Sequence, residues 1–190
     1  MTRPEQTVTR SEQTAKWPAI LASSSSMASR VDRGDDLVEA GRAAEALAIY
    51  EEVIEDYRRA RAAQGPGWNH IFPMQAPAAY ALIGKAHALA ALGRPHDALA
   101  ALDEATGFAD ADEEQGGEED WTARRAAKEA LAEKAKLLEG AGRRAEAIEC
   151  LNWVIRAGSW PSLQAPAEMA KAELERLRAA SGERSAPAAD

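Results

Sequence analysis

The segment GRAAEALAIYEEVI, residues 41–54, decides the fold because it recurs twice along the chain. The copies are GRPHDALAALDEAT at residues 93–106 and GRRAEAIECLNWVI at residues 142–155, and all three align without gaps. Each reads Gly-Arg, two variable residues, an acid, Ala, Leu or Ile, two more variable residues, and then Tyr or Leu. A match of this length indicates repeated structural units.

Each Gly-Arg pair separates two stretches whose apolar residues have helical spacing. Glycine adopts without steric penalty the positive φ that ends a helix, so we expect each unit to be a helix, a tight turn and a second helix. The first helices carry a small residue in one register, Gly34, Ala86 or Ala135, where two helices must approach closely. The second helices repeat one apolar stripe with steps of four and three: Ala46, Tyr50 and Val53; Ala98, Leu102 and Ala105; Ala147, Leu151 and Val154.

The composition favours helices over strands. The chain has 190 residues, 46% of them hydrophobic, which is enough for one domain with a core. Alanine is abundant, whereas Val, Ile, Thr and aromatic residues are sparse, and alanine loses least on entering a helix. We therefore expect an all-α fold with no β-sheet.

Charge and cysteine content restrict the class of protein. The 31 Asp and Glu against 23 Lys and Arg give an acidic chain of net charge −8, which is unsuited to binding nucleic acid. The single cysteine, Cys150, cannot form an intramolecular disulfide. No apolar run is long enough for a signal peptide or a membrane span, so we expect a cytoplasmic protein without membrane contact. The basic residues are mostly Arg, a usage that suggests a GC-rich bacterial genome.

The predicted organisation is one helical domain between two unstructured ends. Residues 1–26 are polar, end in a run of four serines, and are expected to form a disordered leader. Residues 27–180 are expected to fold as a single domain, and residues 181–190 have the composition of a disordered tail. The repeat units are placed at 28–64, 76–109 and 120–157, followed by a capping helix at 166–180.

A truncated fourth unit supplies the predicted capping helix. The sequence Gln-Ala-Pro-Ala opens the first helix of the second unit at residue 75 and recurs at residue 164, and proline is tolerated in a first helical turn. The last helix has no following partner and places Lys171, Glu175 and Arg178 where earlier units carry apolar or small residues. We expect this face to meet water and to close the end of the stack.

These units resemble the tetratricopeptide-repeat family, in which a large, a small and an aromatic residue on the first helix precede Ala and an aromatic on the second. The resemblance covers residues 28–180 and implies a right-handed α-solenoid whose first helices line a concave, protein-binding face. The unit glycines are 52, 49 and 40 residues apart (41 to 93, 93 to 142, 142 to 182), against about 34 in the family. Arg33, Lys85 and Lys134 occupy a position where the family usually has Leu, and their stems are expected to lie along the edge of the hairpin.

No residue pattern predicts catalysis. The histidines, His70, His87 and His96, have no Cys or second His at the spacing of a metal site, and the acidic loop 109–120 departs from a calcium loop. Phosphate-binding, serine-hydrolase and zinc-protease motifs are missing from the sequence. Cys150 is expected to be a small hydrophobe. We expect no enzyme activity, no cofactor and no metal.

The inner face implied by the resemblance gives the candidate binding groove. The first helix of the second unit is apolar opposite its packing stripe, whereas the flanking first helices present mainly acids there. An apolar floor between acidic walls suits a basic, amphipathic segment of a protein or peptide. Alternatively, Tyr80 and Ile83 are covered by the chain itself, either by the loop 68–74 or by residues 17–21. The candidate groove residues are Val31, Asp32, Asp35, Glu39, Tyr80, Ile83, His87, Ala132, Glu133 and Lys136.

The leading hypothesis is a non-catalytic scaffold or adaptor that binds a protein or peptide, with a chaperone for a basic client as a related form. A second hypothesis is a structural element that forms homo-oligomers through the apolar loop 65–77, with Trp68, Ile71 and Phe72 as candidate contacts. A third is an accessory subunit, or an enzyme with a site that no motif reveals.

Overall fold

Seven helices and no strand make up the part of the chain that the structure describes, which is residues 10–64, 72–108, 121–156 and 164–180 of a computed structural model. The prediction of an all-α protein is confirmed for these residues. The helices are α1 (Arg10–Glu39), α2 (Ala43–Gln64), α3 (Phe72–Ala91), α4 (Pro95–Thr106), α5 (Trp121–Gly140), α6 (Arg144–Arg156) and α7 (Gln164–Ala180).

Three equivalent corners close the helix pairs α1–α2, α3–α4 and α5–α6. Gly41, Gly93 and Gly142 have φ angles of 75°, 73° and 75°. At each corner the glycine N–H donates to the carbonyl three residues earlier at 2.8–3.0 Å, and the following N–H donates to the carbonyl five residues earlier at 2.8 Å. This pair of bonds is the Schellman arrangement, which ends a helix at a left-handed glycine. The predicted sequence of helix, tight turn and helix therefore occurs three times.

The other repeated residues also have a role at each corner. The arginine carbonyl accepts the first hydrogen bond of the second helix, at 3.1 Å, from a fully buried alanine four residues later. The arginine side chain pairs with the acid three residues later, at 2.5–2.7 Å: Arg42 with Glu45, Arg94 with Asp97 and Arg143 with Glu146. Gly, Arg, the acid and Ala recur together because they build one corner.

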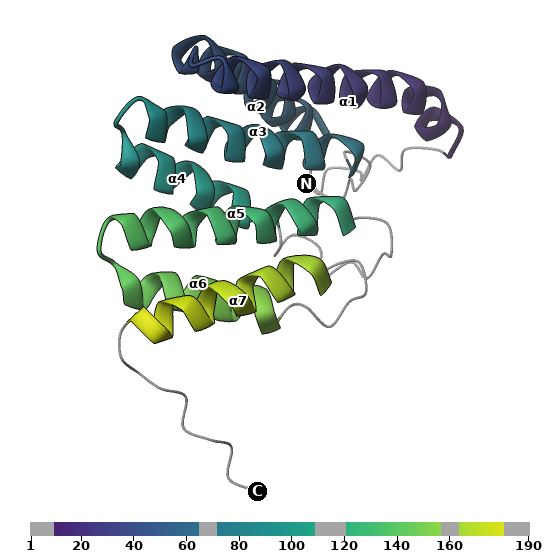
Figure 1. Cartoon of the computed structure of the whole chain (residues 1–190). Coiled ribbons are helices and arrows are strands. Elements are labelled where there is room, and N and C mark those ends of the chain that lie inside the picture. Colours follow the sequence, from purple (N-terminus) through teal and green to yellow (C-terminus); the bar gives the residue numbers. More distant parts are fainter. Residues whose placement is uncertain (1–9, 65–71, 109–120, 157–163, 181–190) are drawn as a thin grey trace, which may run out of the picture.

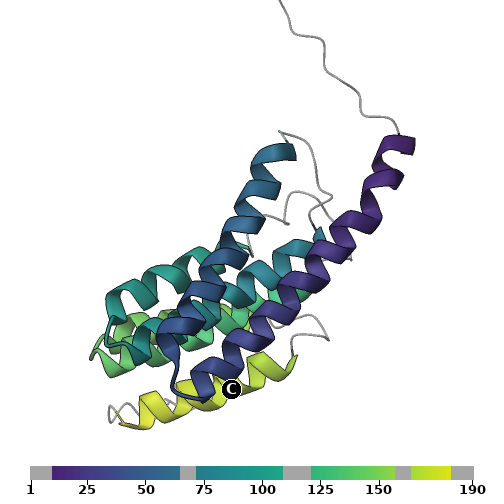
Figure 2. The same cartoon turned by 90° about the horizontal axis from the view of Figure 1, so that it is seen from above.

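The helices lie in two rows. One row consists of α1, α3, α5 and α7, and each of these helices contacts the next (Figure 1). Behind it lie α2, α4 and α6, each packed between two members of the first row. Seen from above, the long helices α1 and α2 meet at their corner and diverge toward their other ends (Figure 2).

The core between α1, α2 and α3 is built around Tyr50. This residue is 0% exposed, and its ring lies between Gly34 of α1 and Gly84 of α3. A Cβ atom at Gly34 would lie 2.5 Å from the ring, and one at Gly84 would lie 2.4 Å from it. The expected close approach at Gly34 is confirmed, and Gly84 is a second such position that the repeat pattern does not mark.

The expected disordered leader is wrong over residues 10–26, which are helical and belong to α1. Met27 is almost fully buried, and Ile20 packs against the main core, so the helix continues past the expected boundary. The reason is that the serines between these two residues lie on a helix that packs against the first turns of α3. The composition of the serine segment does not reveal this contact with α3.

The expected start of α3 is also wrong, because the helix begins at Phe72 and Pro77 lies in its second turn. Proline has no N–H, so the carbonyl of Pro73, four residues earlier, loses its helical donor. The hydroxyl of Ser24 on α1 donates a hydrogen bond to that carbonyl. The early turns of α3 and the serine segment of α1 therefore support each other.

Ion pairs join the first helices α3 and α5 to the second helix of the preceding unit. Lys85 of α3 pairs with Glu51 of α2 at 3.2 Å, and Lys134 of α5 pairs with Asp103 of α4. Each lysine is eight residues before the corner glycine of its own unit. Each acid is ten residues after the corner glycine of the preceding unit. Both lysine side chains are about three-quarters buried, as expected of stems that lie along the hairpin edge.

The last helix covers one end of the stack. Ala170, Leu174 and Leu177 of α7 are buried in a core shared with α5 and α6. The opposite face, with Lys171, Glu175 and Arg178, is exposed, which confirms the predicted polar face. None of the described helices combines the length and the apolar character that a membrane span requires.

Candidate functional site: a pocket between α1 and α3

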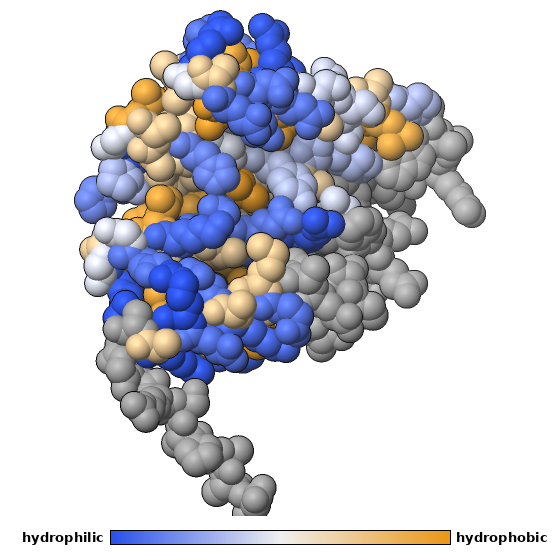
Figure 3. Space-filling view, viewed as in Figure 1, coloured by the Kyte–Doolittle hydropathy of each residue, from blue (hydrophilic) through white to orange (hydrophobic). Residues whose placement is uncertain are grey.

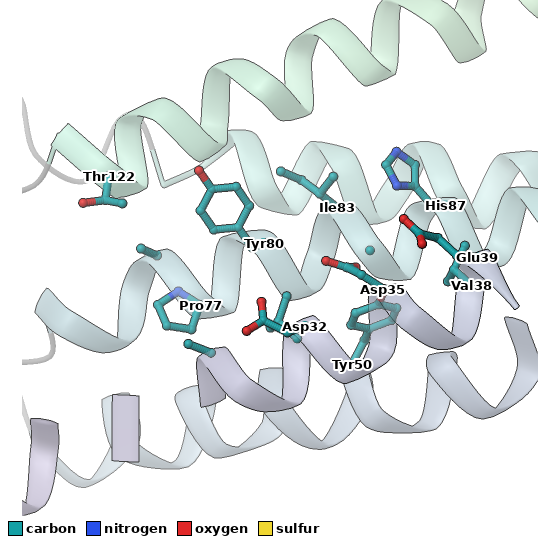
Figure 4. Close-up of a pocket in the computed structure, with 14 residues that line it drawn as sticks. Asp32, Asp35, Val38, Glu39, Tyr50, Pro77, Tyr80, Ile83, His87 and Thr122 are labelled. Carbon is teal, nitrogen blue, oxygen red and sulfur yellow. The ribbon is translucent and has the colours of Figure 1, made fainter. Parts of the chain in front are cut away.

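A pocket of about 610 Å³ opens between α1 and α3, with Tyr50 of α2 at its base and Thr122 of α5 at one end (Figure 4). It lies in the row of first helices, on a face where hydrophobic residues alternate with hydrophilic bands (Figure 3). Its volume is within the range of ligand-binding pockets. The remaining lining residues are Ala28, Val31, Asp32, Asp35, Val38 and Glu39 of α1, and Ala76, Pro77, Tyr80, Ile83, Gly84 and His87 of α3.

Three exposed carboxylates, Asp32, Asp35 and Glu39, form what we call the acidic wall of the pocket. Their spacing of three and four residues places them on one face of α1. Among the described side chains none of the three has a cationic partner, although Asp35 accepts a hydrogen bond from the Tyr50 hydroxyl at 2.5 Å. Burial, together with this hydrogen bond, raises the pKa of Tyr50 well above its usual value, so the phenol stays protonated as the donor.

The opposite side, which we call the apolar wall, consists of Pro77, Tyr80 and Ile83 of α3. Ile83 is 8% exposed and also belongs to the main core, whereas Tyr80 is half-buried. Burial, and then the charge of Glu129 on α5, raise the pKa of Tyr80 and keep this wall uncharged. His87 lies at the end of the wall, where it faces Glu39 (Figure 4).

Gly84 lines the pocket on the α3 side, and the Tyr50 ring occupies the space beside it. Gly84 is nine residues before Gly93, and Glu133 is nine residues before Gly142, so the two occupy the same register position. In the next interval, Glu133 extends from α5 to bind His87 of α3 at 3.3 Å, and it also binds Lys136 at 2.7 Å. The Glu133 side chain therefore bridges α5 and α3, whereas the same register position in α3 is a glycine that borders the pocket.

The Glu133 carboxylate is strongly stabilised in its charged form. The hydrogen bond from His87, reinforced by Lys136, lowers the pKa of Glu133 to about 2 against the cost of partial burial. Glu129, one turn earlier on α5, pairs with Arg125 at 2.9 Å. The acids on α5 are thus neutralised within the protein, in contrast to those of the acidic wall.

The structure brings most of the predicted groove residues together. The three that lie outside the pocket, Ala132, Glu133 and Lys136, are on α5, where the last two form the cluster around His87. The candidate loop contacts Trp68 and Ile71, and the side chain of Phe72, lie outside the described residues, as does the acidic loop 109–120. The seven that line the pocket are Val31, Asp32, Asp35, Glu39, Tyr80, Ile83 and His87.

The sequence-based prediction missed Gly84 and the pocket role of Tyr50. Tyr50 was expected only as a member of the apolar stripe, yet its hydroxyl reaches the acidic wall through the space beside Gly84. Glycine inside a helix costs about 1 kcal/mol relative to alanine, so its presence there indicates a close approach or an open space. That signal was available in the sequence of α3.

A second hollow of about 650 Å³ lies where α1 and α2 diverge. Arg30 of α1 binds Asp56 of α2 at 2.5 Å, and Arg59 binds the same carboxylate. Its polar groups are therefore largely paired with one another, and this hollow lacks the one-sided charge of the first pocket.

Comparison of the chain with protein-family models, with curated proteins and with solved structures gives no match. The candidate site is therefore interpreted from its own geometry.

Proposed function

We propose that this protein is a non-catalytic scaffold or adaptor that binds a basic segment of a protein or peptide on its row of first helices. The observation that carries the proposal is the acidic wall, in which three carboxylates without a described cationic partner face an apolar wall across the pocket. Acids at the corners and on α5 are ion-paired within the protein. A basic, amphipathic partner supplies the missing cations and covers the apolar wall.

The repeat architecture supports the same function. We propose that the helix pairs form a right-handed α-solenoid of tetratricopeptide-like repeats, with α1, α3, α5 and α7 as its inner row. The proposal is supported by the three equivalent corners and by the contact of each first helix with the next. Solenoids of this kind present a continuous binding surface along one face.

The test is capture of partners from native lysate by immobilised protein, read by quantitative mass spectrometry. The double variant Asp32→Lys with Glu39→Lys reverses the charge of the acidic wall but keeps the Asp35–Tyr50 hydrogen bond. We expect it to lose at least about 90% of the captured partners, and the wild-type capture to weaken as salt rises from about 0.05 to 0.5 M.

The matched control is Asp36→Lys, since Asp36 is an exposed acid on the same helix that does not line the pocket. This variant should retain the captured partners. Equal loss in both variants, or equal retention in both, would contradict a role for the acidic wall. Thermal melts of all three proteins separate loss of binding from loss of folding.

A further inference from the structure

The two walls of the pocket are matched in length and pitch. On α1 the lining runs from Ala28 to Glu39, and on α3 it runs from Ala76 to His87, twelve residues in each case. At a rise of about 1.5 Å per residue, both walls extend for about 16 Å. Because both are α-helices, the side chains of each wall recur at helical spacing.

This spacing discriminates between possible conformations of a partner. The carboxylates at positions 32, 35 and 39 are separated by rises of about 4.5 and 6 Å, or about 10.5 Å in all. Three side chains on one face of an extended strand span about 13 Å, because alternate residues are about 6.6 Å apart. Cationic side chains at helical positions i, i+4 and i+7, or i, i+3 and i+7, span the same 10.5 Å as the acidic wall.

The apolar wall imposes a second condition. Pro77, Tyr80 and Ile83 recur every three residues, opposite the carboxylates (Figure 4). A partner must therefore present a basic stripe to α1 and an adjacent apolar stripe to α3 over the same length. An amphipathic helix satisfies both conditions, because residues three and four apart share a face and the two stripes lie side by side on its surface.

We infer that the partner segment is a basic amphipathic helix of about twelve residues, which lies lengthwise between α1 and α3. Its cationic side chains pair with Asp32, Asp35 and Glu39, and its apolar side chains pack on Tyr80 and Ile83. The inference rests on the proposed function and adds the conformation and charge register of the ligand.

Fluorescence anisotropy with designed peptides tests the inference. The first probe is a labelled 14-residue peptide with Lys at i, i+4 and i+7 and Leu along the adjacent stripe. The second has the same composition with its residues reordered so that Lys and Leu alternate with the period of a strand, and the third is the helical peptide with one central proline. We expect the helical probe to bind at least about 10-fold more tightly than either of the others, with spermidine competing weakly because it cannot cover the apolar wall.

The protein variants assign the binding to this pocket. The variant Asp32→Lys with Glu39→Lys should weaken the helical probe at least about 10-fold, whereas Asp36→Lys should change its affinity by less than about 2-fold. Equal binding of the helical, strand-period and proline probes overturns the helical inference and leaves the proposed basic partner standing. Absence of saturable binding by every probe overturns the basic partner together with the inference, and displacement by spermidine at equal concentration overturns the role of the apolar wall.

Discussion

The interval between α1 and α3 and the interval between α3 and α5 are bounded by helices in the same register, yet the pocket of about 610 Å³ lies in the first. One register position differs between the two intervals. In α3 this position is Gly84, and the Tyr50 ring lies beside it. In α5 the same position is Glu133, and its carboxylate binds His87 of α3. The corners that set the stack are the same in both units.

The difference shows that the repeat and the site are specified separately. The corner residues hold each helix pair in place and vary little between units, whereas the residue nine positions before the unit glycine varies from glycine to glutamate. A stack of equivalent helix pairs can therefore carry a pocket in one interval and an ion-paired cluster in the next. Substitutions at Tyr50, Gly84 and Glu133 test this separation.

The largest effect is expected at Tyr50. Replacing the ring with leucine, the residue at the equivalent positions 102 and 151, leaves space beside Gly34 and Gly84 and should lower the free energy of unfolding by about 2–4 kcal/mol. Gly84→Ala should destabilise the wild type by about 1–2 kcal/mol, because its Cβ would lie 2.4 Å from the ring. In the Tyr50→Leu background the same substitution should stabilise by about 1 kcal/mol, since the ring is gone and alanine favours helix. Urea unfolding of the four proteins measures this reversal of sign.

The control for helix propensity is Gly140→Ala, because a Cβ at Gly140 would meet nothing within 4 Å. Gly140→Ala should change the free energy of unfolding by the same small amount in the wild type and in the Tyr50→Leu background. If Gly84→Ala also behaves identically in both backgrounds, the packing of the Tyr50 ring does not depend on Gly84.

The second effect concerns the ion-paired cluster. The pKa of Glu133 is about 2 in the folded protein, below the usual carboxyl value, so its charged form contributes stability above about pH 4.5 that is lost as pH falls toward 2. Between pH 4.5 and 2, the free energy of unfolding of Glu133→Gln should fall by on the order of 2 kcal/mol less than that of the wild type. Urea unfolding at a series of pH values measures it, with Glu52→Gln, at an exposed glutamate of α2, as the control. An unchanged slope in Glu133→Gln would show that the cluster does not stabilise the fold.

The smallest effect is expected for the ion pairs between units. Double-mutant cycles at Lys85–Glu51 and at Lys134–Asp103 should give similar coupling free energies of about 0.2–1 kcal/mol, since the acids are exposed and the lysine stems are largely buried. Both couplings should decrease in high salt. The pair Lys171–Glu168 within α7 is the reference for an intrahelical contact. If only one of the two pairs shows a measurable coupling free energy, the ion pairs do not stabilise the two intervals equally.

Some of the fold could be predicted because it depends on neighbours in sequence. The Gly-Arg corners form from residues within five positions of one another, so their recurrence at 41, 93 and 142 marks three helix pairs. The polar face of α7 follows from helical spacing in the same way. The candidate residues on α1 and α3 are predicted to share one surface because they occupy matching helical positions relative to the corner glycines.

Other features could not be predicted because they depend on contacts between helices far apart in sequence. The serine segment before residue 27 has the composition of a linker, but Ser24 donates to the Pro73 carbonyl that Pro77 leaves without a partner. The position of Pro77 suggested the start of a helix and not its second turn. In both cases a partner 49 residues away outweighs the local preference.

Three properties follow from the sequence: the described residues form helices, these helices pair at three glycine corners, and particular residues face one common side. All three arise from local backbone geometry and from the 3.6-residue helical period. The place of the pocket on that side depends on contacts between helices. The Tyr50 ring lies between two glycines that are 50 residues apart, and Glu133 meets a histidine of the preceding unit. The pocket and the ion-paired cluster therefore depend on distances between helices that are far apart in sequence.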